Sequence, residues 1–564
     1  ALPPEVLAYA DMVLYNGKVL SADDQFSIFQ AIAVREGKIL AVGDSSRILT
    51  MAGPTTQKVD LNGKSVIPGF NEVHSSAVVG KHGPSGPMLP EGMRTRIPFP
   101  TLDIGLNMIK ALVDRAQPGE WVVVDVPINK LTFQLNRTIL DTVAPNNPLY
   151  VNYALDSVVN SMVLEMVPPD MPGIGRDENG EPNGKLAGFA HGYLSYELVP
   201  FPSIKDLETK YAAEQKQMLE KAASLGITSL GSRGSGPTVI IMRALWARGE
   251  LPIRIRLALD FARMNANAEA YFRRIGNLEG IGDSWLKIGG NTTESLDGTP
   301  GRAGLLTRKP KLQEPPNMGA YGPLGENKFE HAGGAEPDWR EKSDYNTILL
   351  ANRYGWNTND IHARGDRAVD IAIEVFERAD QERPIKGRRF GFVHGDMRTA
   401  DQIAKLIQWD AILSVNPKYL FLGRSVPDLY KITYGADALH GMFPVKSLIN
   451  AGLKPVIESN TDYPPDTTFT YLSLLEKFIT RKNEVTGEVY GQDERISREE
   501  ALWAATNWAS RFYNDEHQQG TLEVGKLADM VILDGDYMTV PEENISDIPV
   551  VMTIVGGKVV YQRP

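Results

Sequence analysis

The sequence contains no cysteine. Disulfide bonds, thiolate nucleophiles, zinc–thiolate sites and iron–sulfur clusters are therefore excluded. It also has no run of eighteen or more apolar residues, which argues against a membrane-spanning helix. Basic residues are outnumbered, with 59 Lys and Arg against 70 Asp and Glu, and the net charge of −11 is spread along the chain. Without a clustered basic patch, we expect no nucleic-acid or membrane partner and a small-molecule substrate instead.

The cellular compartment stays open at this point, because a chain without thiols is compatible with reducing and oxidising surroundings alike. The sequence begins at Ala1 rather than at a methionine. Such a start fits the removal of an initiator methionine and equally the removal of a leader peptide. Cytoplasmic and periplasmic or secreted locations both remain open.

Both ends of the chain are rich in short strand patterns separated by turns. Asn16-Gly17 and Glu36-Gly37 divide apolar runs near the start, and Gly556-Gly557 does so near the end. Such dipeptides between alternating apolar residues are hairpin signals. We expect residues 1–66 and 513–564 to pair into one small β-sandwich, with two unrelated edge hairpins as the alternative.

The middle of the chain, residues 67–512, alternates short apolar runs with helical patterns. Alternation of this kind predicts parallel strands joined by crossover helices, that is, an α/β fold. A (β/α)₈ barrel fits best, because a doubly wound sheet usually carries a G-x-G-x-x-G turn that is missing here. The predicted strands are Ile227–Leu230, Ile253–Leu259, Trp285–Ile288, Phe390–His394, Ala411–Val415 and Pro455–Glu458, and the predicted helices are Glu208–Leu225, Pro237–Arg248, Tyr345–Tyr354, Arg367–Arg378 and Thr399–Ile407.

Two segments interrupt this alternation. Residues 80–202 are rich in Pro and Gly and fit the barrel pattern poorly. Residues 291–344 follow a predicted strand and are long for a connection without structure of its own. We expect both to be insertions, with the second forming a lid or substrate-enclosing loop.

Five polar residues end or lie in apolar, strand-like runs of the predicted barrel: His74, Lys287, His362, His394 and Asp462. The carboxyl ends of barrel strands supply the active site of such folds. Each residue alone is as well explained by a structural hydrogen bond or, for Asp462, by a turn before proline. Together they suit a divalent metal with nitrogen and oxygen ligands and a carboxylate that accepts the proton of an activated water. Asp462 is the expected general base.

The motif Val66-Ile67-Pro68-Gly69-Phe70-Asn71-Glu72-Val73-His74 resembles the opening motif of the amidohydrolase superfamily. The resemblance is to the branch of N-substituted formamide deformylases and related metal-dependent hydrolases. It continues in family order through 177–186, Leu225–Thr228, His362–Asp370, Leu448–Gly452 and Thr461–Pro464, and closes with G-T-L-E-V-G-K-L-A-D at 520–529.

The resemblance implies roles for the same five residues. His74 matches the first histidine of the family's H-x-H pair, and Lys287 matches the lysine that bridges two metals when carboxylated. His362 and His394 match the ligands on the fifth and sixth strands, and Asp462 matches the aspartate on the eighth. All five are therefore expected metal ligands, and Asp462, His394 and Lys287 are the expected catalytic groups.

The sequence also departs from the family pattern at four positions around the expected site. Ser76 stands where the second histidine of H-x-H is usual, and Glu72 stands at the acidic position before the pair. Asp156 replaces a histidine in the run that ends Asn160-Ser161, and Val393 replaces a glutamate before His394. We expect Ser76, Asp156 and Asn160 to contact the substrate.

Three functions remain open. The first is a hydrolase of an amide, formamide or cyclic amide C–N bond that uses one zinc ion. The second is a metal-independent lyase, hydratase or isomerase, in which the histidines, Asp462 and a free Lys287 amine act as acids and bases. The third is a binding protein without catalysis. Substrate identity is not readable, and a homodimer is an open alternative to a monomer.

Overall fold

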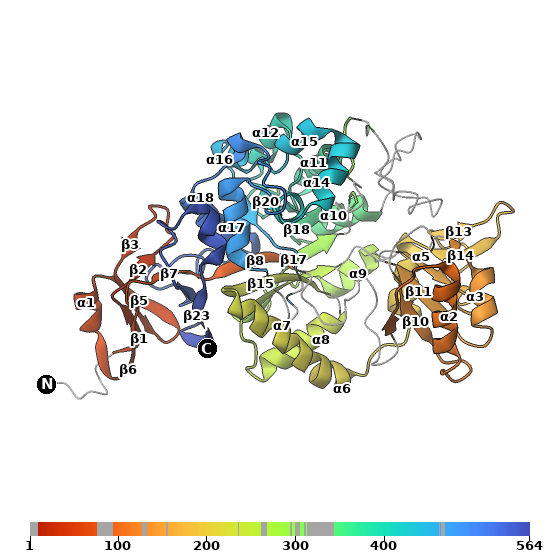
Figure 1. The fold of residues 1–564 in the computed structure, drawn as a ribbon, viewed down its shortest axis with the longest axis horizontal. Helices are drawn as coiled ribbons and strands as arrows, with labels where there is room; N and C mark the ends of the chain where they lie inside the picture. The colour runs from red at the N-terminus through yellow and green to blue at the C-terminus, as the bar shows by residue number, and fades with distance from the viewer. Residues whose placement is uncertain are drawn as a thin grey trace.

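The computed structural model describes residues 9–75, 94–126, 131, 134–153, 156–234, 236–260, 268–293, 296–298, 305–309, 312, 343–461, 463 and 469–564. In this part of the chain, no helix combines the length and apolar character needed to cross a bilayer. The described elements form a central α/β body, a sheet domain made by both chain ends, and a separate inserted lobe (Figure 1).

Eight parallel strands form the central sheet, and their order in space follows their order in the chain. The strands are β8 (Phe70–Ser75), β15 (Ile227–Gly234), β16 (Arg254–Asp260), β17 (Leu286–Thr293), β18 (Thr358–His362), β19 (Gly391–Val393), β20 (Ile412–Val415) and β21 (Val456–Ile457). Sequential order with parallel pairing is the topology of a (β/α)₈ barrel. The predicted fold class is confirmed.

Helices follow the barrel strands and cover the outside of the sheet. They are α7 (Ala212–Ser224), α8 (Gly236–Ala247), α9 (Ala268–Ile275), α10 (Ser343–Arg353), α11 (Asp366–Glu382), α12 (Ala400–Gln408), α13 (Lys418–Phe421), α14 (Ser425–Tyr434), α15 (Ala436–His440), α16 (Val445–Asn450), α17 (Tyr471–Thr480), α18 (Arg498–Ala505) and α19 (Asn507–Ser510). Their apolar faces pack against the strands, and the buried side chains between the two layers form the largest hydrophobic cluster of the molecule.

The seam between the first strand, β8, and the last, β21, is closed by hydrogen bonds from the segment after β21. The Asn460 amide donates to the carbonyl of His74 over 3.1 Å. The Ser459 amide donates to the buried carboxylate of Glu72 over 2.9 Å, and the Ser75 hydroxyl donates to the carbonyl of Thr461 over 2.7 Å. These bonds close the ring of strands at the end where the strands finish.

The chain ends meet in two further sheets at one side of the barrel (Figure 1). One has the order β5–β4–β1–β6 and the other β24–β23–β22–β7–β2–β3, so that N-terminal and C-terminal strands share the second sheet. The strands are β1 (Ala10–Tyr15), β2 (Lys18–Leu20), β3 (Ile28–Phe29), β4 (Ala31–Arg35), β5 (Lys38–Gly43), β6 (Ala52–Asp60), β7 (Ser65–Pro68), β22 (Met530–Leu533), β23 (Val550–Val555) and β24 (Lys558–Gln562), with helix α1 (Ser45–Leu49) beside them.

The inserted lobe lies on the side of the barrel away from the sandwich, in orange in Figure 1. Its six-stranded sheet has the order β13–β14–β12–β11–β10–β9, and separate apolar clusters cover its two faces. Its elements are β9 (Arg94–Arg96), α2 (Leu102–Val113), β10 (Val122–Asp125), α3 (Arg137–Val143), β11 (Leu149–Tyr153), β12 (Asp156–Val159), α4 (Ser161–Leu164), β13 (Ile174–Arg176), β14 (Pro182–Leu186) and α5 (Gly188–Tyr193). The insertion expected at 80–202 thus contains a folded sheet, whereas most of 291–344 lies outside the described residues.

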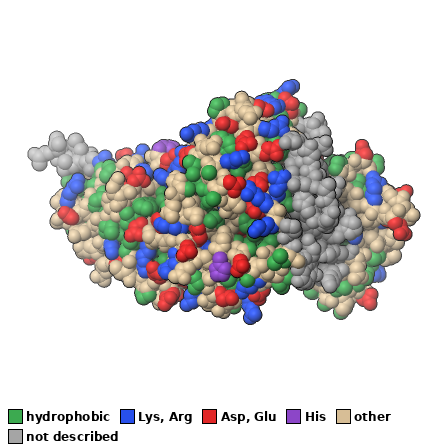
Figure 2. All heavy atoms as spheres, turned by 90° about the horizontal axis from the view of Figure 1, so that it is seen from above, with side chains coloured by type: hydrophobic (Ala, Val, Ile, Leu, Met, Phe, Trp, Pro, Cys, Tyr) green, Lys and Arg blue, Asp and Glu red, His purple; other side chains and the backbone are tan. Residues whose placement is uncertain are grey.

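The outer surface carries mixed charge. Figure 2 shows Lys and Arg side chains interspersed with Asp and Glu over the described part of the face seen from above.

A buried ion pair joins the barrel to the sandwich. Arg254, at the start of β16, donates to both carboxylate oxygens of Asp529 over 2.6 and 2.9 Å. Asp529 also accepts the amide of Gly556 over 2.8 Å, and its carbonyl accepts the amide of Gly69. Gly69 links β7 to β8, and a Cβ there would lie 2.1 Å from the side chain of Thr228, so that only glycine lets the two domains approach this closely.

We predict that Asp529→Asn lowers the free energy of unfolding by about 3 kcal/mol, because it leaves the buried Arg254 guanidinium without its counter-charge. The control is Asp534→Asn, which breaks an exposed pair with Lys64 and is expected to cost no more than about 1 kcal/mol. Urea unfolding of both variants measures the difference. Equal effects of the two substitutions would show that the pair does not hold the domains together.

Candidate metal centre at the barrel mouth

Three histidines from three barrel strands meet where the strands finish. His74 is next to last in β8, His362 is the last residue of β18, and His394 directly follows β19. The ring centroids of His74 and His394 lie 5.0 Å apart, and those of His362 and His394 lie 4.5 Å apart. All three side chains are buried. The structure therefore brings together the three imidazoles that the sequence nominated.

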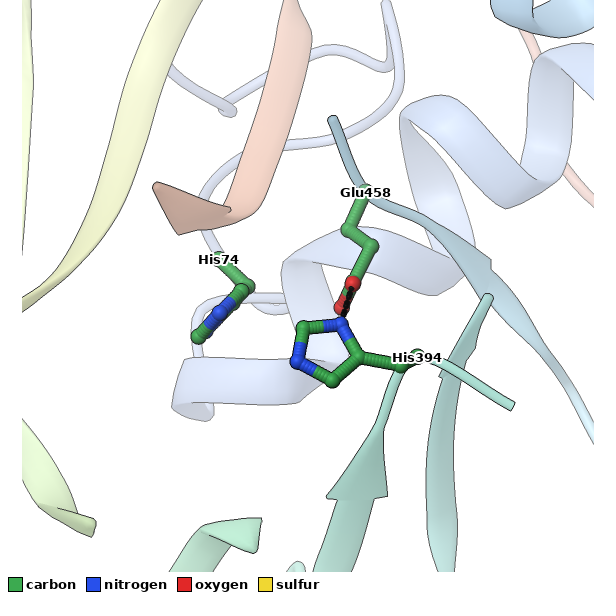
Figure 3. A group of neighbouring side chains, drawn as sticks. All are labelled: His74, His394 and Glu458. Carbon is green, nitrogen blue, oxygen red and sulfur yellow. Dashed lines mark hydrogen bonds and ion pairs between the residues drawn. The ribbon is translucent and has the colours of Figure 1, made fainter. Parts of the chain in front are cut away.

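Glu458 joins this group from the eighth strand. It directly follows β21, is fully buried, and contacts Nδ1 of His394 through Oε1 (Figure 3). Its second oxygen accepts a hydrogen bond from the hydroxyl of Ser414, on β20. Burial raises the pKa of the Glu458 carboxyl above its ordinary value. The pair thus fixes the orientation of the His394 ring.

His394 has a strained backbone. Its φ is +84°, in the left-handed region that a residue with a side chain rarely adopts. The next residue, Gly395, also has a positive φ of 63°, and a Cβ there would lie 2.5 Å from Val415. Such strain persists where the surroundings hold it, and it is concentrated at functional sites. The turn aims the imidazole into the barrel rather than along the strand.

His74 is held by a second carboxylate, Asp360 on β18. Its Nδ1 lies 3.2 Å from Oδ2 of Asp360. The same carboxylate accepts two hydrogen bonds from the guanidinium of Arg233, from Nε over 3.0 Å and from Nη2 over 2.8 Å. Burial opposes ionisation of Asp360, but Arg233 and His74 outweigh it and hold the pKa of this carboxyl below its ordinary value. Asp360 is therefore a buried anion shared by an imidazole and a guanidinium.

Burial favours the neutral form of His362 and His394. Burial lowers the pKa of His362 well below its ordinary value, and the nearby His394 and Arg364 act in the same direction. Burial lowers the pKa of His394 likewise, with Arg364 and His74 contributing. Neutral imidazole is the form that binds a metal ion.

Glu72 forms hydrogen bonds at the seam between β8 and β21. Its carboxylate accepts the amides of His74 and Ser459, each over 2.9 Å, and the hydroxyl of Tyr463 over 2.8 Å. Burial raises the pKa of Glu72 to about 7, although these three hydrogen bonds oppose the shift. The carboxyl thus fixes the backbone of His74 relative to the eighth strand.

The chemistry of this set fits one metal ion of the zinc type. His74, His394 and Glu458 each offer a ligand atom, and these atoms lie within 4.8 Å of one another. Two imidazoles and one carboxylate form a ligand set known from catalytic zinc sites, where a fourth position stays open for water or substrate. A carboxylate contacts Nδ1 of each ring, Asp360 at His74 and Glu458 at His394, and fixes the orientation of that ring.

Lys287 is not placed with the histidines, and the expectation that it bridges two metals requires correction. It is the second residue of β17, which continues to Thr293, so that it lies at the amino end of the strand. Its Nζ pairs with the carboxylate of Asp515 and donates to the carbonyl of Tyr513 over 3.1 Å. The sequence-based strand ended too early, at Ile288, and this error put the lysine at the wrong end.

Asn160 is a structural residue, and its expected contact with substrate requires correction too. Its side-chain oxygen accepts the amides of Leu149 and Val163, as the N-cap of helix α4. Its NH₂ group donates to the carbonyls of Ala144 and Asn147. Because the fully buried amide has used its hydrogen-bonding capacity, it has none for a ligand.

The remaining expected residues cannot be placed. Ser76 and Asp462 lie outside the described residues, and for Asp156 only the backbone, in β12, is described.

Three residues of the site were missed from the sequence, and the signals for them were present. Glu458 ends an apolar strand-like run, which is the pattern that singled out the histidines. Arg233 lies near the end of β15 in the same way. Asp360 precedes His362 by two residues in β18, and alternate residues of a strand point to the same face.

Comparison with known proteins agrees with the fold. The chain is 23% identical over 575 residues to the N-substituted formamide deformylase of Arthrobacter pascens, covering 98% of both chains. It is 25% identical to the protein LONG AFTER FAR-RED 3 of Arabidopsis thaliana, covering 100% of this chain and 93% of the relative. A metal-dependent hydrolase of Pyrococcus horikoshii, whose structure is known, superposes with a TM-score of 0.64 at 19% identity, covering 94% of this chain and 99% of the other.

The model of the amidohydrolase family matches residues 57–561, which span the barrel, the inserted lobe and the C-terminal strands of the sandwich. With the histidines at the strand ends, this match leads to one conclusion: the chain belongs to the amidohydrolase family and is a hydrolase of that type.

Proposed function

We propose that this protein is a metal-dependent hydrolase that cleaves a carbon–nitrogen bond of a small molecule, in an amide, a formamide or a cyclic amide. Membership of the amidohydrolase family supports this reaction class. The name of one relative, an N-substituted formamide deformylase, supports the substrate class. The observation that carries the proposal is the buried group of His74, His394 and Glu458 at the barrel mouth.

One zinc ion is the proposed cofactor. Neutral imidazoles and a carboxylate are ligands that zinc prefers, and the absence of cysteine removes the competing thiolate sites. When bound, a divalent ion acts as a Lewis acid that polarises a carbonyl group and makes water more acidic.

The remaining roles belong to side chains of the protein. His74, His394 and Glu458 would hold the cofactor. Asp360 contacts Nδ1 of His74, Glu458 contacts Nδ1 of His394, and these contacts fix both rings. His362 lies against His394 as a third imidazole, and its Nε2 is 3.2 Å from the carbonyl of Gly298. Asp462 remains the predicted general base.

One observation favours a second candidate, a metal-independent lyase, hydratase or isomerase. Ser414, Glu458 and His394 form a continuous chain of short contacts. A buried carboxylate paired with an imidazole is also a device for moving a proton, and it requires no ion. The two candidates differ in their response to chelation.

We predict about one zinc ion per chain of purified protein, and loss of activity towards N-substituted formamides after chelation. His74→Ala and His394→Ala are expected to remove the ion. Glu458→Gln is expected to weaken its affinity about 10- to 100-fold, because a neutral amide replaces a charged ligand that also orients His394. Elemental analysis and a hydrolysis assay measure both effects.

The matched control is His517→Asn, which changes an exposed histidine and should leave metal content at the wild-type level. Protein that holds no metal yet hydrolyses the formamide equally well after chelation would overturn the metal dependence and support metal-independent acid–base catalysis.

A separate prediction concerns Lys287. Lys287→Gln is expected to lower the thermal midpoint, because the buried Asp515 loses one of its two cationic partners, while metal content stays unchanged. Differential scanning calorimetry and elemental analysis test this pair of outcomes. A fall in bound metal in Lys287→Gln would show instead that Lys287 takes part in holding metal, as a carboxylated lysine would.

A further inference from the structure

The mouth of the barrel contains a positive charge of its own. Arg233 lies near the carboxyl end of β15, and its side chain is about 20% exposed. It reaches across to Asp360 on β18, donating to both carboxylate oxygens and, over 3.4 Å, to the backbone carbonyl of the same residue. A planar guanidinium in this bidentate arrangement is held in a fixed position.

This charge is joined to the candidate metal site through Asp360. Asp360 lies two residues before His362 on the same strand and so faces the barrel mouth. It contacts Nδ1 of His74 and has an exposed fraction of 1%. In the described part of the chain, Lys287 cannot serve as a bridging ligand as placed, because its ammonium is paired with Asp515.

We infer that Arg233 replaces a second metal ion in this site, so that the centre binds at most one ion, held by His74, His394 and Glu458, beside a permanent guanidinium. Asp360 is then the positioning residue that holds the guanidinium and the His74 ring together. The part of this inference that places one ion in the site rests on the proposed metal-dependent hydrolase. The part in which Arg233 takes the place of a second ion does not rest on it.

Arg233 balances the charge of the buried Asp360 carboxylate. A buried carboxylate requires a cation, and Asp360 obtains it from Arg233. If the guanidinium is removed, the place beside the buried Asp360 carboxylate is open to another cation. A divalent ion is the cation that this site, with imidazoles beside the carboxylate, would recruit. Removing Arg233 should therefore increase metal binding, whereas loss of a merely structural residue would decrease it.

The test is titration of metal-free protein with Zn²⁺ and with Co²⁺, followed by calorimetry and, for cobalt, by its visible spectrum. Wild-type protein is expected to bind one ion. Arg233→Gln is expected to bind a second ion, or to bind one at least about tenfold more tightly, because a fixed positive charge has been removed. Its thermal midpoint should rise with added Zn²⁺ more than that of the wild type.

Two controls separate this effect from misfolding. The double variant with Asp360→Asn should lose the added metal binding and regain stability without metal, because neither charge remains. Arg243→Gln removes an exposed arginine whose nearest carboxylate oxygen, on Glu208, is 3.9 Å away, and should behave as wild type.

The outcomes distinguish this inference from the proposed function. Two ions in the wild type would overturn the inference and leave the hydrolase standing. No ion in the wild type but binding in Arg233→Gln would overturn the metal-dependent hydrolase and support the replacement of an ion by Arg233. Binding in neither protein, or weaker binding in Arg233→Gln, would overturn the inference.

Discussion

Closure of the barrel between its first and last strands is the constraint on which the site depends. His74 and Glu458 are 384 positions apart in the numbering, yet each offers a ligand atom to the same small group. They meet because the segment after β21 donates to the Glu72 carboxylate and to the His74 carbonyl. Breaking the three hydrogen bonds to the buried Glu72 carboxyl group would cost free energy. These bonds therefore keep β8 and β21 aligned. The ligand geometry is therefore a consequence of the way the fold closes.

The balance of charge at the mouth decides what this geometry can do. Asp360 and Glu458 each hold one imidazole, but their surroundings differ. Arg233 and His74 hold the pKa of Asp360 below its ordinary value, whereas burial raises the pKa of Glu458. A cation that enters beside His394 would meet the Glu458 carboxyl group, and binding of that cation would favour the ionised form. In this account the guanidinium and the metal occupy neighbouring places without competing for one carboxylate.

The sequence predicted the parts of the fold that depend on periodicity. The helix expected at 208–225 is observed as two consecutive helical segments over 207–224, and the strand expected at Ile227–Leu230 begins at Ile227. The three histidines could be nominated because strand ends of a barrel converge on one face. The same rule gave a wrong position for Lys287, because the pattern did not show that β17 continues past two glycines to Thr293. The rule applies only when the last residue of each strand is known, and strand boundaries are what a sequence pattern predicts least accurately.

Other features depended on contacts that no local pattern contains. The ion pair of Arg233 and Asp360 joins the second and fifth strands, 127 residues apart. Asn160 carried a local signal, since an asparagine before Ser161 is a typical helix N-cap, but the family resemblance drew attention to substrate instead. The sheet of the inserted lobe was hidden by its glycines and prolines, because its strands are short and joined by turns.

The central claim is that one metal ion lies between His74, His394 and Glu458. Its most direct test is a crystal of protein purified without chelator, measured on both sides of the zinc absorption edge. The account predicts a single anomalous peak within coordination distance of both imidazoles, with the Arg233–Asp360 pair intact beside it. An empty barrel mouth, or two peaks about 3.5–4 Å apart as in two-metal sites, would contradict it.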